Sequence, residues 1–275
     1  MKELVWHFPT NLAEAIDLVR DGAPPHAGGT GILRTGASKL TRLVDLHRLP
    51  LEYLDVTGDV VEMGAMLTFS DVVTRMQSVD PGSILIESLG QAASTPLRNR
   101  ITLGGSVAMA PPWSDLIGPL LALDAEVVLA PGRGTETTCP VARFLDDRAA
   151  RKGTLVKAIR FRPGAWDSVY CRATRTHFDY AAFTLTALVR KNPRGEVEEA
   201  RLVVTGNKRR YQRLAAQEQA VIGRKAEDVA DLSQVVAGAQ ADVEFGPKSI
   251  GGPEYVGHLF GVELERALKR AIRGW

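Results

Sequence analysis

Short blocks of apolar residues follow one another along the chain, and their spacing changes repeatedly between that of a helix and that of a strand. Near the start, Thr10 is a candidate helix N-cap, followed by apolar residues at helical spacing up to a stop at Gly22. A β-hairpin is expected where residues 54–56 and 60–63 flank the Gly58-Asp59 turn. The other elements expected before residue 164 are strands at 43–46, 126–129 and 155–161 and helices at 68–76, 84–93 and 116–123.

The pattern changes after Pro163-Gly164. Beyond this point we expect strands at 169–173 and 197–204, and helices at 180–191 (capped by Asp179), 214–222, 226–237 and 253–273. The last helix carries its apolar residues on one face. Strands and helices are mixed on both sides of Pro163-Gly164, which predicts two α+β domains, residues 1–164 and 165–275.

Composition narrows the possible classes of protein. The 275 residues are 45% hydrophobic and 24% charged with a net charge of +2, which is typical of a globular protein and gives no reason to expect nucleic-acid binding. Cys139 and Cys171 lie far apart and cannot hold an iron–sulfur cluster by themselves. No apolar run is long enough for a membrane span, and the first residues do not resemble an export signal. We therefore expect a cytoplasmic protein.

Two glycine-rich segments carry the candidate chemistry. The first is Ala27-Gly28-Gly29-Thr30-Gly31-Ile32-Leu33, and the second is Thr102-Leu103-Gly104-Gly105-Ser106. Adjacent glycines let the backbone come close to a ligand and point several amides at one place. Two such segments predict a diphosphate held from two sides, which indicates a dinucleotide cofactor.

Other readings of these segments fit less well. A Walker A loop would need lysine where Ala37 stands, and a Rossmann fingerprint would need glycine where Arg34 stands. Ser106 lies in a near match to a hydrolase nucleophile elbow, with Ala108 in place of the last glycine, but no partner for it is evident. The five histidines are scattered along the sequence, so no metal site is predicted.

In these segments and their surroundings the chain resembles the flavin-binding medium subunit of the molybdenum hydroxylases, the family of xanthine dehydrogenase and carbon monoxide dehydrogenase. The resemblance extends over essentially the whole sequence. The residues that carry it are Arg98-Asn99, Thr102 to Ser106, Pro112, Asp115, Leu121 to Ala125, Ala27 to Thr30 and Asp179 to Ala181, with further support from Glu218, Gly223 and Tyr255.

The resemblance implies a fold and a set of cofactor residues. The fold would be α+β: a two-subdomain FAD-binding fold of the vanillyl-alcohol oxidase type (subdomains about 1–55 and 56–164), then a smaller α+β C-terminal domain. Arg172 stands where the family commonly has a lysine near the flavin, and we expect it to stabilise negative charge on the reduced flavin. The full implied set for binding FAD is Ala27, Gly28, Gly29, Thr30, Gly31, Ile32, Leu33, Thr102, Gly104, Gly105, Ser106, Asp115, Val156 and Arg172.

The resemblance also implies a role. The chain would be an oxidoreductase subunit that carries FAD, takes electrons from 2Fe–2S clusters on a small partner subunit and passes them to an external acceptor. A large partner subunit would hold a molybdopterin-type molybdenum cofactor, giving a heterotrimer or a dimer of heterotrimers. No catalytic residue and no metal ligand is expected in this chain. The alternatives are a stand-alone flavin oxidase of the same superfamily, or a scaffold subunit that has lost FAD.

Overall fold

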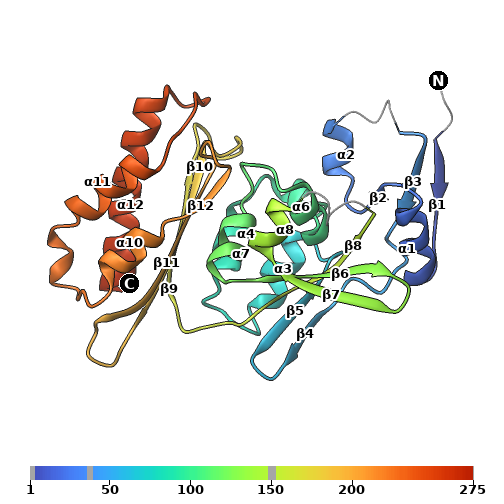
Figure 1. The fold of residues 1–275 in the computed structure, drawn as a ribbon, viewed down its shortest axis with the longest axis horizontal. Helices are drawn as coiled ribbons and strands as arrows, with labels where there is room; N and C mark the ends of the chain where they lie inside the picture. The colour runs from blue at the N-terminus through green and yellow to red at the C-terminus, as the bar shows by residue number, and fades with distance from the viewer. Residues whose placement is uncertain (1–3, 36–39, 148–152, 275) are drawn as a thin grey trace. The chain divides into compact units, whose positions relative to one another are not determined.

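The structure, a computed structural model, describes residues 4–35, 40–147 and 153–274. Two compact units are present, each assembled from separate stretches of the chain (Figure 1). The first unit comprises Met1–Arg75, Ser94–Ala110 and Leu123–Pro163, and the second comprises Met76–Ala93, Pro111–Ala122 and Gly164–Trp275. The predicted contiguous domains, 1–164 and 165–275, stay a prediction.

The first unit contains a small parallel sheet with the strand order β1-β3-β2. Its strands are β1 (Val5–His7), β2 (Pro25–His26) and β3 (Arg42–Asp45). Helix α1 (Leu12–Arg20) packs against β3, and its N-cap is Asn11 and not the predicted Thr10. The Asn11 side chain accepts a hydrogen bond from the amide of Glu14, because Asn11 is the last residue with extended backbone before the helix.

A second sheet of the first unit has five antiparallel strands in the order β4-β5-β8-β6-β7. The strands are β4 (Leu54–Thr57), β5 (Val60–Gly64), β6 (Glu126–Gly132), β7 (Thr135–Pro140) and β8 (Leu155–Phe161). The predicted hairpin is confirmed, since Leu54 pairs with Met63 across its turn. The remaining helices of this unit are α2 (Thr30–Thr35), α3 (Phe69–Met76), α5 (Thr95–Arg98), α6 (Leu103–Met109) and α8 (Val141–Asp146).

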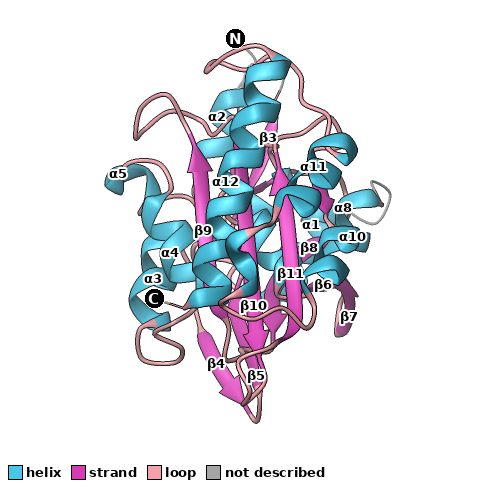
Figure 2. Cartoon of the chain, turned by 90° about the vertical axis from the view of Figure 1, so that its left-hand side faces the viewer, coloured by secondary structure: helices cyan, strands magenta, loops and turns pink. Residues whose placement is uncertain are grey.

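The second unit is built around an antiparallel sheet with the order β12-β11-β10-β9. Figure 2 shows α10, α11 and α12 over one face of this sheet, while α4 and α7 also pack on its strands. The strands are β9 (Asp167–Ala173), β10 (Phe183–Lys191), β11 (Val197–Thr205) and β12 (Tyr211–Arg213). The helices are α4 (Ile84–Gln91), α7 (Ile117–Ala122), α10 (Ala215–Val221), the 3₁₀ turn η2 (Asp228–Ala230), α11 (Ser233–Asp242) and α12 (Pro253–Arg273).

The predicted helix at 180–191 is wrong, because most of this stretch forms strand β10. The strand is buried on both faces, and the alternation of apolar residues with threonine over residues 183–186 gives way to three apolar residues at 187–189, so it does not extend along the strand. Phe183 and Leu185 belong to the core that also contains residues of α12, whereas Thr184 and Thr186 lie under Gly118 of α7. The predicted helix at 226–237 is likewise replaced by η2 and α11.

The predicted terminal helix is confirmed as α12, whose buried residues recur at helical spacing and include Val256, Phe260, Leu264 and Leu268. It begins with Pro253, which suits the first helical position because its missing N–H would have no partner there. Among the helices that the structure describes, none has both the length and the apolar content needed to cross a bilayer.

Candidate cofactor site

The first glycine segment links strand β2 to helix α2. Gly29 has φ of +76°, a conformation that favours glycine. Gly28 lies against the backbone of Arg100: a Cβ at this position would be 1.5 Å from the Arg100 carbonyl oxygen. The Arg100 side chain completes the contact, because its Nε donates a hydrogen bond to the Gly28 carbonyl at 3.1 Å. Gly28 therefore permits a backbone approach that no other residue would allow.

This contact brings the two glycine-rich segments together, since Arg100 stands two residues before Thr102, the start of the second one. A further contact joins the helices that follow them: a Cβ at Gly31 would lie 1.7 Å from the Sδ of Met109. Helix α2 thus packs closely on α6. Segments that lie more than sixty residues apart in the sequence are neighbours in the first unit, as a shared ligand would require.

The second glycine segment forms the start of helix α6, with Thr102 as its N-cap. A Cβ at Gly104 would lie 2.7 Å from the Cβ of Ala65, so this glycine allows α6 to approach the end of β5. Thr102 Oγ1 accepts a hydrogen bond from the amide of Gly105 at 3.2 Å. The amides of Leu103, Gly104 and Ser106 donate to the carbonyls of Leu67, Ala65 and Thr102.

These bonds correct the expectation that several amides of the second segment point at a ligand. The expectation treated residues 102–106 as an open loop, but the helix begins at Leu103 and its first amides already have acceptors. The first segment differs from it. Among the described residues, none accepts a hydrogen bond from the amides of Gly28 and Gly29. The first segment is therefore the better anion cradle of the two.

The other predicted cofactor residues of the first unit lie in helix α2 and in strand β8. Thr30, Gly31, Ile32 and Leu33 form the first turn of α2. Val156 lies in β8, where it is 7% exposed and pairs with Leu129. Helix α6 packs on β8, so the second glycine segment and the strand that contains Val156 are neighbours. Whether each of these residues binds a cofactor stays a prediction.

Asp115 and Arg172, both predicted to contact the cofactor, are partners of each other in the second unit. Arg172 Nε donates to Asp115 Oδ1 at 2.8 Å, and the two side chains are only 7% and 9% exposed. The hydroxyl of Tyr170 donates to the same oxygen at 2.7 Å. Burial raises the pKa of the Asp115 carboxyl, and the charge of Arg172 and the hydrogen bond from Tyr170 oppose that rise.

The guanidinium of Arg172 also holds the loop that follows β9. Its Nη1 donates to the carbonyl of His177 at 2.8 Å, and its Nη2 donates to the carbonyl of Asp179 at 2.6 Å. All three types of nitrogen in the side chain are therefore bonded within the protein. Asp115 retains one acceptor, since none of the described residues donates to its Oδ2. A contact between Arg172 and a flavin stays a prediction.

Sequence reasoning missed the role of Tyr170 and the meeting of three polar residues in the small parallel sheet. In the sequence, Tyr170 is one residue of a predicted strand, and nothing near it indicates that its hydroxyl would bind Asp115. In the sheet, His26 and His47 flank Asp45 closely enough to hold a metal ion, which differs from the expectation that the histidines are scattered. Asp45 and His47 are two residues apart, but only strand register brings His26 to them, and sequence spacing does not show that.

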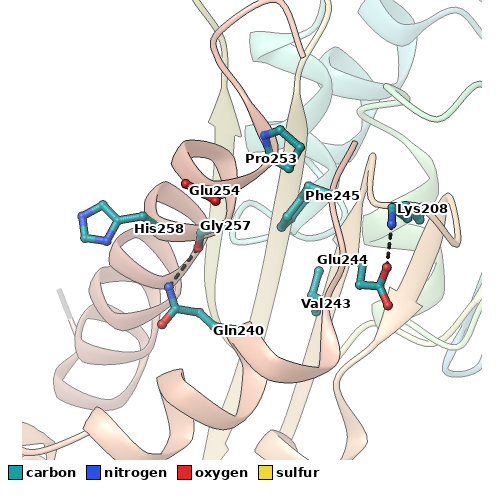
Figure 3. A pocket seen from close by; sticks show the side chains of 9 residues that line it. All are labelled: Lys208, Gln240, Val243, Glu244, Phe245, Pro253, Glu254, Gly257 and His258. Carbon is teal, nitrogen blue, oxygen red and sulfur yellow. Dashed lines mark hydrogen bonds and ion pairs between the residues drawn. The ribbon is translucent and has the colours of Figure 1, made fainter. Parts of the chain in front are cut away.

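A hollow of about 520 Å³ lies on the second unit beside α11 and α12 (Figure 3). Gln240 bridges to the carbonyl of Gly257 at 3.0 Å, and Lys208 pairs with Glu244 at 2.7 Å along its edge. None of the residues predicted to bind a cofactor lines it. Its charged lining is already paired in part, and we assign no ligand to it.

Two family models match the chain. Residues 2–162 match the FAD binding domain in molybdopterin dehydrogenase, and residues 168–271 match the CO dehydrogenase flavoprotein C-terminal domain. The chain belongs to the flavoprotein family of the molybdopterin dehydrogenases. As a member of this family it is an FAD-binding medium subunit of the molybdenum hydroxylase type, and thus an oxidoreductase subunit.

Relatives of this flavoprotein match along most of its length. It is 26% identical to the 6-hydroxypseudooxynicotine dehydrogenase complex subunit alpha of Paenarthrobacter nicotinovorans, over 95% of this chain and 92% of that protein. It is also 26% identical to the glyceraldehyde dehydrogenase medium chain of Sulfolobus acidocaldarius, over 82% and 84% of the two chains. A solved carbon monoxide dehydrogenase from Hydrogenophaga pseudoflava, which lacks the Mo-pyranopterin moiety, matches with a TM-score of 0.86 and 26% identity, covering 98% and 97%.

Proposed function

We propose that this flavoprotein carries FAD and transfers electrons within a multi-subunit molybdenum-dependent dehydrogenase. It takes electrons from iron–sulfur clusters on a small partner subunit and passes them to an external acceptor. A large partner subunit holds the molybdenum cofactor and oxidises the organic substrate. The observation that carries the proposal is the packing of Gly28 on Arg100, which joins the two glycine-rich segments of a domain whose family binds FAD.

The first glycine segment suits a diphosphate. Gly28 and Gly29 present amides without acceptors among the described residues, and neither carries a side chain that would keep an anion away. The start of helix α2 adds the positive end of its peptide dipoles at the same place. The contact between Gly31 and Met109 fixes this helix start against α6. These residues would hold the diphosphate of FAD.

A bound FAD would supply the redox chemistry, because a flavin accepts electrons singly and releases them in pairs. The protein's part is to bind and orient it. The chain contains only two cysteines, fewer than the four that an iron–sulfur cluster requires, which supports placing the clusters on a partner. Arg172 and Asp115 enter the proposal as flavin contacts on the strength of the family resemblance alone.

FAD binding is tested at Gly105, which tolerates change structurally better than Gly28. A Cβ at Gly105 meets only the Oγ1 of Thr102, at 2.9 Å, so Gly105→Val is expected to fold. We expect this variant to lose most of its FAD, measured as visible flavin absorption per chain. Gly90→Val is the matched control, because nothing lies within 4 Å of a Cβ at Gly90 in helix α4. Full flavin content in Gly105→Val would refute the approach of FAD to the second glycine-rich segment.

The role as an electron-transfer subunit needs a second experiment. The chain is purified from cells that express it with its neighbouring subunits, and metals and flavin are measured in the same sample. We expect molybdenum, iron and FAD to co-purify, and a reduced organic substrate to bleach the flavin. A flavin-containing chain that oxidises substrate alone would indicate a stand-alone oxidase. A complex without flavin would indicate a scaffold subunit.

A further inference from the structure

A parallel strand pair places His26 beside Asp45 in the first unit. His26 ends β2 and Asp45 ends β3, and the two residues are partners in the register of the sheet. His47 follows two residues later, where its backbone amide donates to Asp45 Oδ1 at 2.9 Å. One strand register and one tight turn therefore bring the three side chains together.

The donor atoms of the three side chains point at one another. His26 Nδ1 lies 3.4 Å from Asp45 Oδ2, and His47 Nδ1 lies 3.1 Å from Asp45 Oδ1. All three ligand atoms lie within 4.8 Å of one another. Ligands at about 2.0–2.1 Å from a tetrahedral cation are separated by about 3.3 Å, which is close to both measured separations. The two separations end on different oxygens of Asp45, so a cation needs a small rotation of the side chains to close the site, and His47 is 54% exposed and able to turn.

A second observation concerns the environment of His26. Its Nδ1 is buried and makes no hydrogen bond with the described residues, although Asp45 is near, because the geometry between them is unsuitable. An unpartnered buried nitrogen is costly unless another group satisfies it. Trp6 covers the ring edge-on, with centroids 4.9 Å apart. The other ring nitrogen, Nε2, lies beside the backbone of Gly29, where a Cβ would approach to 2.9 Å.

We propose that His26, Asp45 and His47 form a binding site for a divalent first-row transition cation, at the point where the chain enters the first glycine segment. Two imidazoles and one carboxylate form a ligand set suited to zinc or iron, whereas magnesium and calcium prefer all-oxygen sites. The exposed side of His47 leaves room for water or another ligand to complete the coordination. The cation would tie β2 to β3 and fix the ring of His26 against Gly29. The site does not depend on the proposed FAD role.

Zinc is the probe. The full-length protein, with its flavin, is dialysed against a chelator and then titrated with Zn²⁺ in a calorimeter, and bound zinc is counted by metal analysis. We expect one zinc per chain. His47→Ala and Asp45→Asn should each weaken binding by about tenfold or more. Asp45→Asn retains an oxygen acceptor for the amide of His47, so the turn is preserved. His258→Ala, an exposed histidine of α12, is the control and should bind zinc like the wild type.

The coordination is checked independently by zinc X-ray absorption, which should detect two imidazoles at about 2.0 Å in the wild type and one in His47→Ala. The melting temperature of each zinc-free variant shows whether it is folded, and His47→Ala is the safest because its side chain is half exposed. Failure to bind zinc would overturn the proposal. Binding with equal affinity in the wild type, His47→Ala and Asp45→Asn would overturn it as well. Neither result would bear on FAD binding.

Discussion

Replacing Arg172 by alanine removes the cation that pairs with the buried carboxylate of Asp115. The Asp115 side chain is 9% exposed, so it would keep the hydrogen bond from Tyr170 but lose its counter-charge. Removing one partner of a buried ion pair costs about 3–5 kcal/mol in the free energy of unfolding. The carbonyls of His177 and Asp179 also lose a donor, but they lie in a surface loop where water can replace it. We therefore expect Arg172→Ala to lower the free energy of unfolding by about 3–5 kcal/mol in total.

The loss should also depend on pH. Without Arg172 the pKa of Asp115 in the folded protein rises further above its value in the unfolded chain, because only the hydrogen bond from Tyr170 still opposes the effect of burial. Because its pKa is higher in the folded state, Asp115 binds a proton more tightly there than in the unfolded chain. Lowering the pH through the folded-state pKa therefore raises the variant's free energy of unfolding above its value at pH 7. The difference from the wild type should therefore shrink in acid.

The assay is urea unfolding at several pH values, followed by circular dichroism. Arg175→Ala is the matched control, since Arg175 pairs with Asp179 from an exposed position and should change stability little. A loss below about 1 kcal/mol in Arg172→Ala, or a loss that stays constant with pH, would refute this account of the ion pair.

Three further predictions concern other contacts. Burial opposes ionisation of Glu62, but hydrogen bonds from Tyr53 and Arg160 hold the pKa of its carboxyl below 4.5. Glu62→Gln should therefore lower the free energy of unfolding by about 1 kcal/mol at neutral pH, measured by urea unfolding. This difference from the wild type should disappear once the pH falls through the pKa of Glu62 in the folded protein. Burial, aided by Glu263, raises the pKa of the Cys171 thiol to about 12. Iodoacetamide at pH 8 should therefore alkylate Cys139 many times faster than Cys171. Equal alkylation rates of the two cysteines, measured by mass spectrometry, would contradict this. Gly118→Val should overpack α7 on β10 and cost about 1–3 kcal/mol, while an unchanged urea midpoint would mean that the helix can shift freely.

Elements with a strong local signal were predictable from the sequence. The hairpin around Gly58-Asp59 has a turn between two short apolar runs, and α12 has both a proline start and an apolar face, so both were correctly predicted. Strand β10 was not, because helices cover both of its faces and the alternation that starts at Phe183 is lost at residues 187–189, so the pattern fits either structure. The two glycine-rich segments were found, but the amides at the start of α6 are used within the protein, which depends on the distant carbonyls of Ala65 and Leu67.

The site was predictable only where residues are close in sequence. The contact between Gly28 and Arg100 and the cluster around Asp45 depend on strand register and helix packing. The approach of Arg100 to Gly28 and that of His26 to Asp45 leave no spacing that a sequence motif could record. The ion pair of Asp115 with Arg172 was likewise hidden, although both residues were singled out for another reason.

The discontinuous make-up of the second unit limits how this protein can be cut or synthesised in pieces. A fragment that starts at Gly164 would contain the whole four-stranded sheet and its three C-terminal helices, but it would lack α4 and α7. The threonine face of β10, including Thr184 and Thr186, would then be open to water and to neighbouring chains. On the ribosome, residues 76–93 and 111–122 emerge first and must await strands made later, so this unit can assemble only near the end of translation.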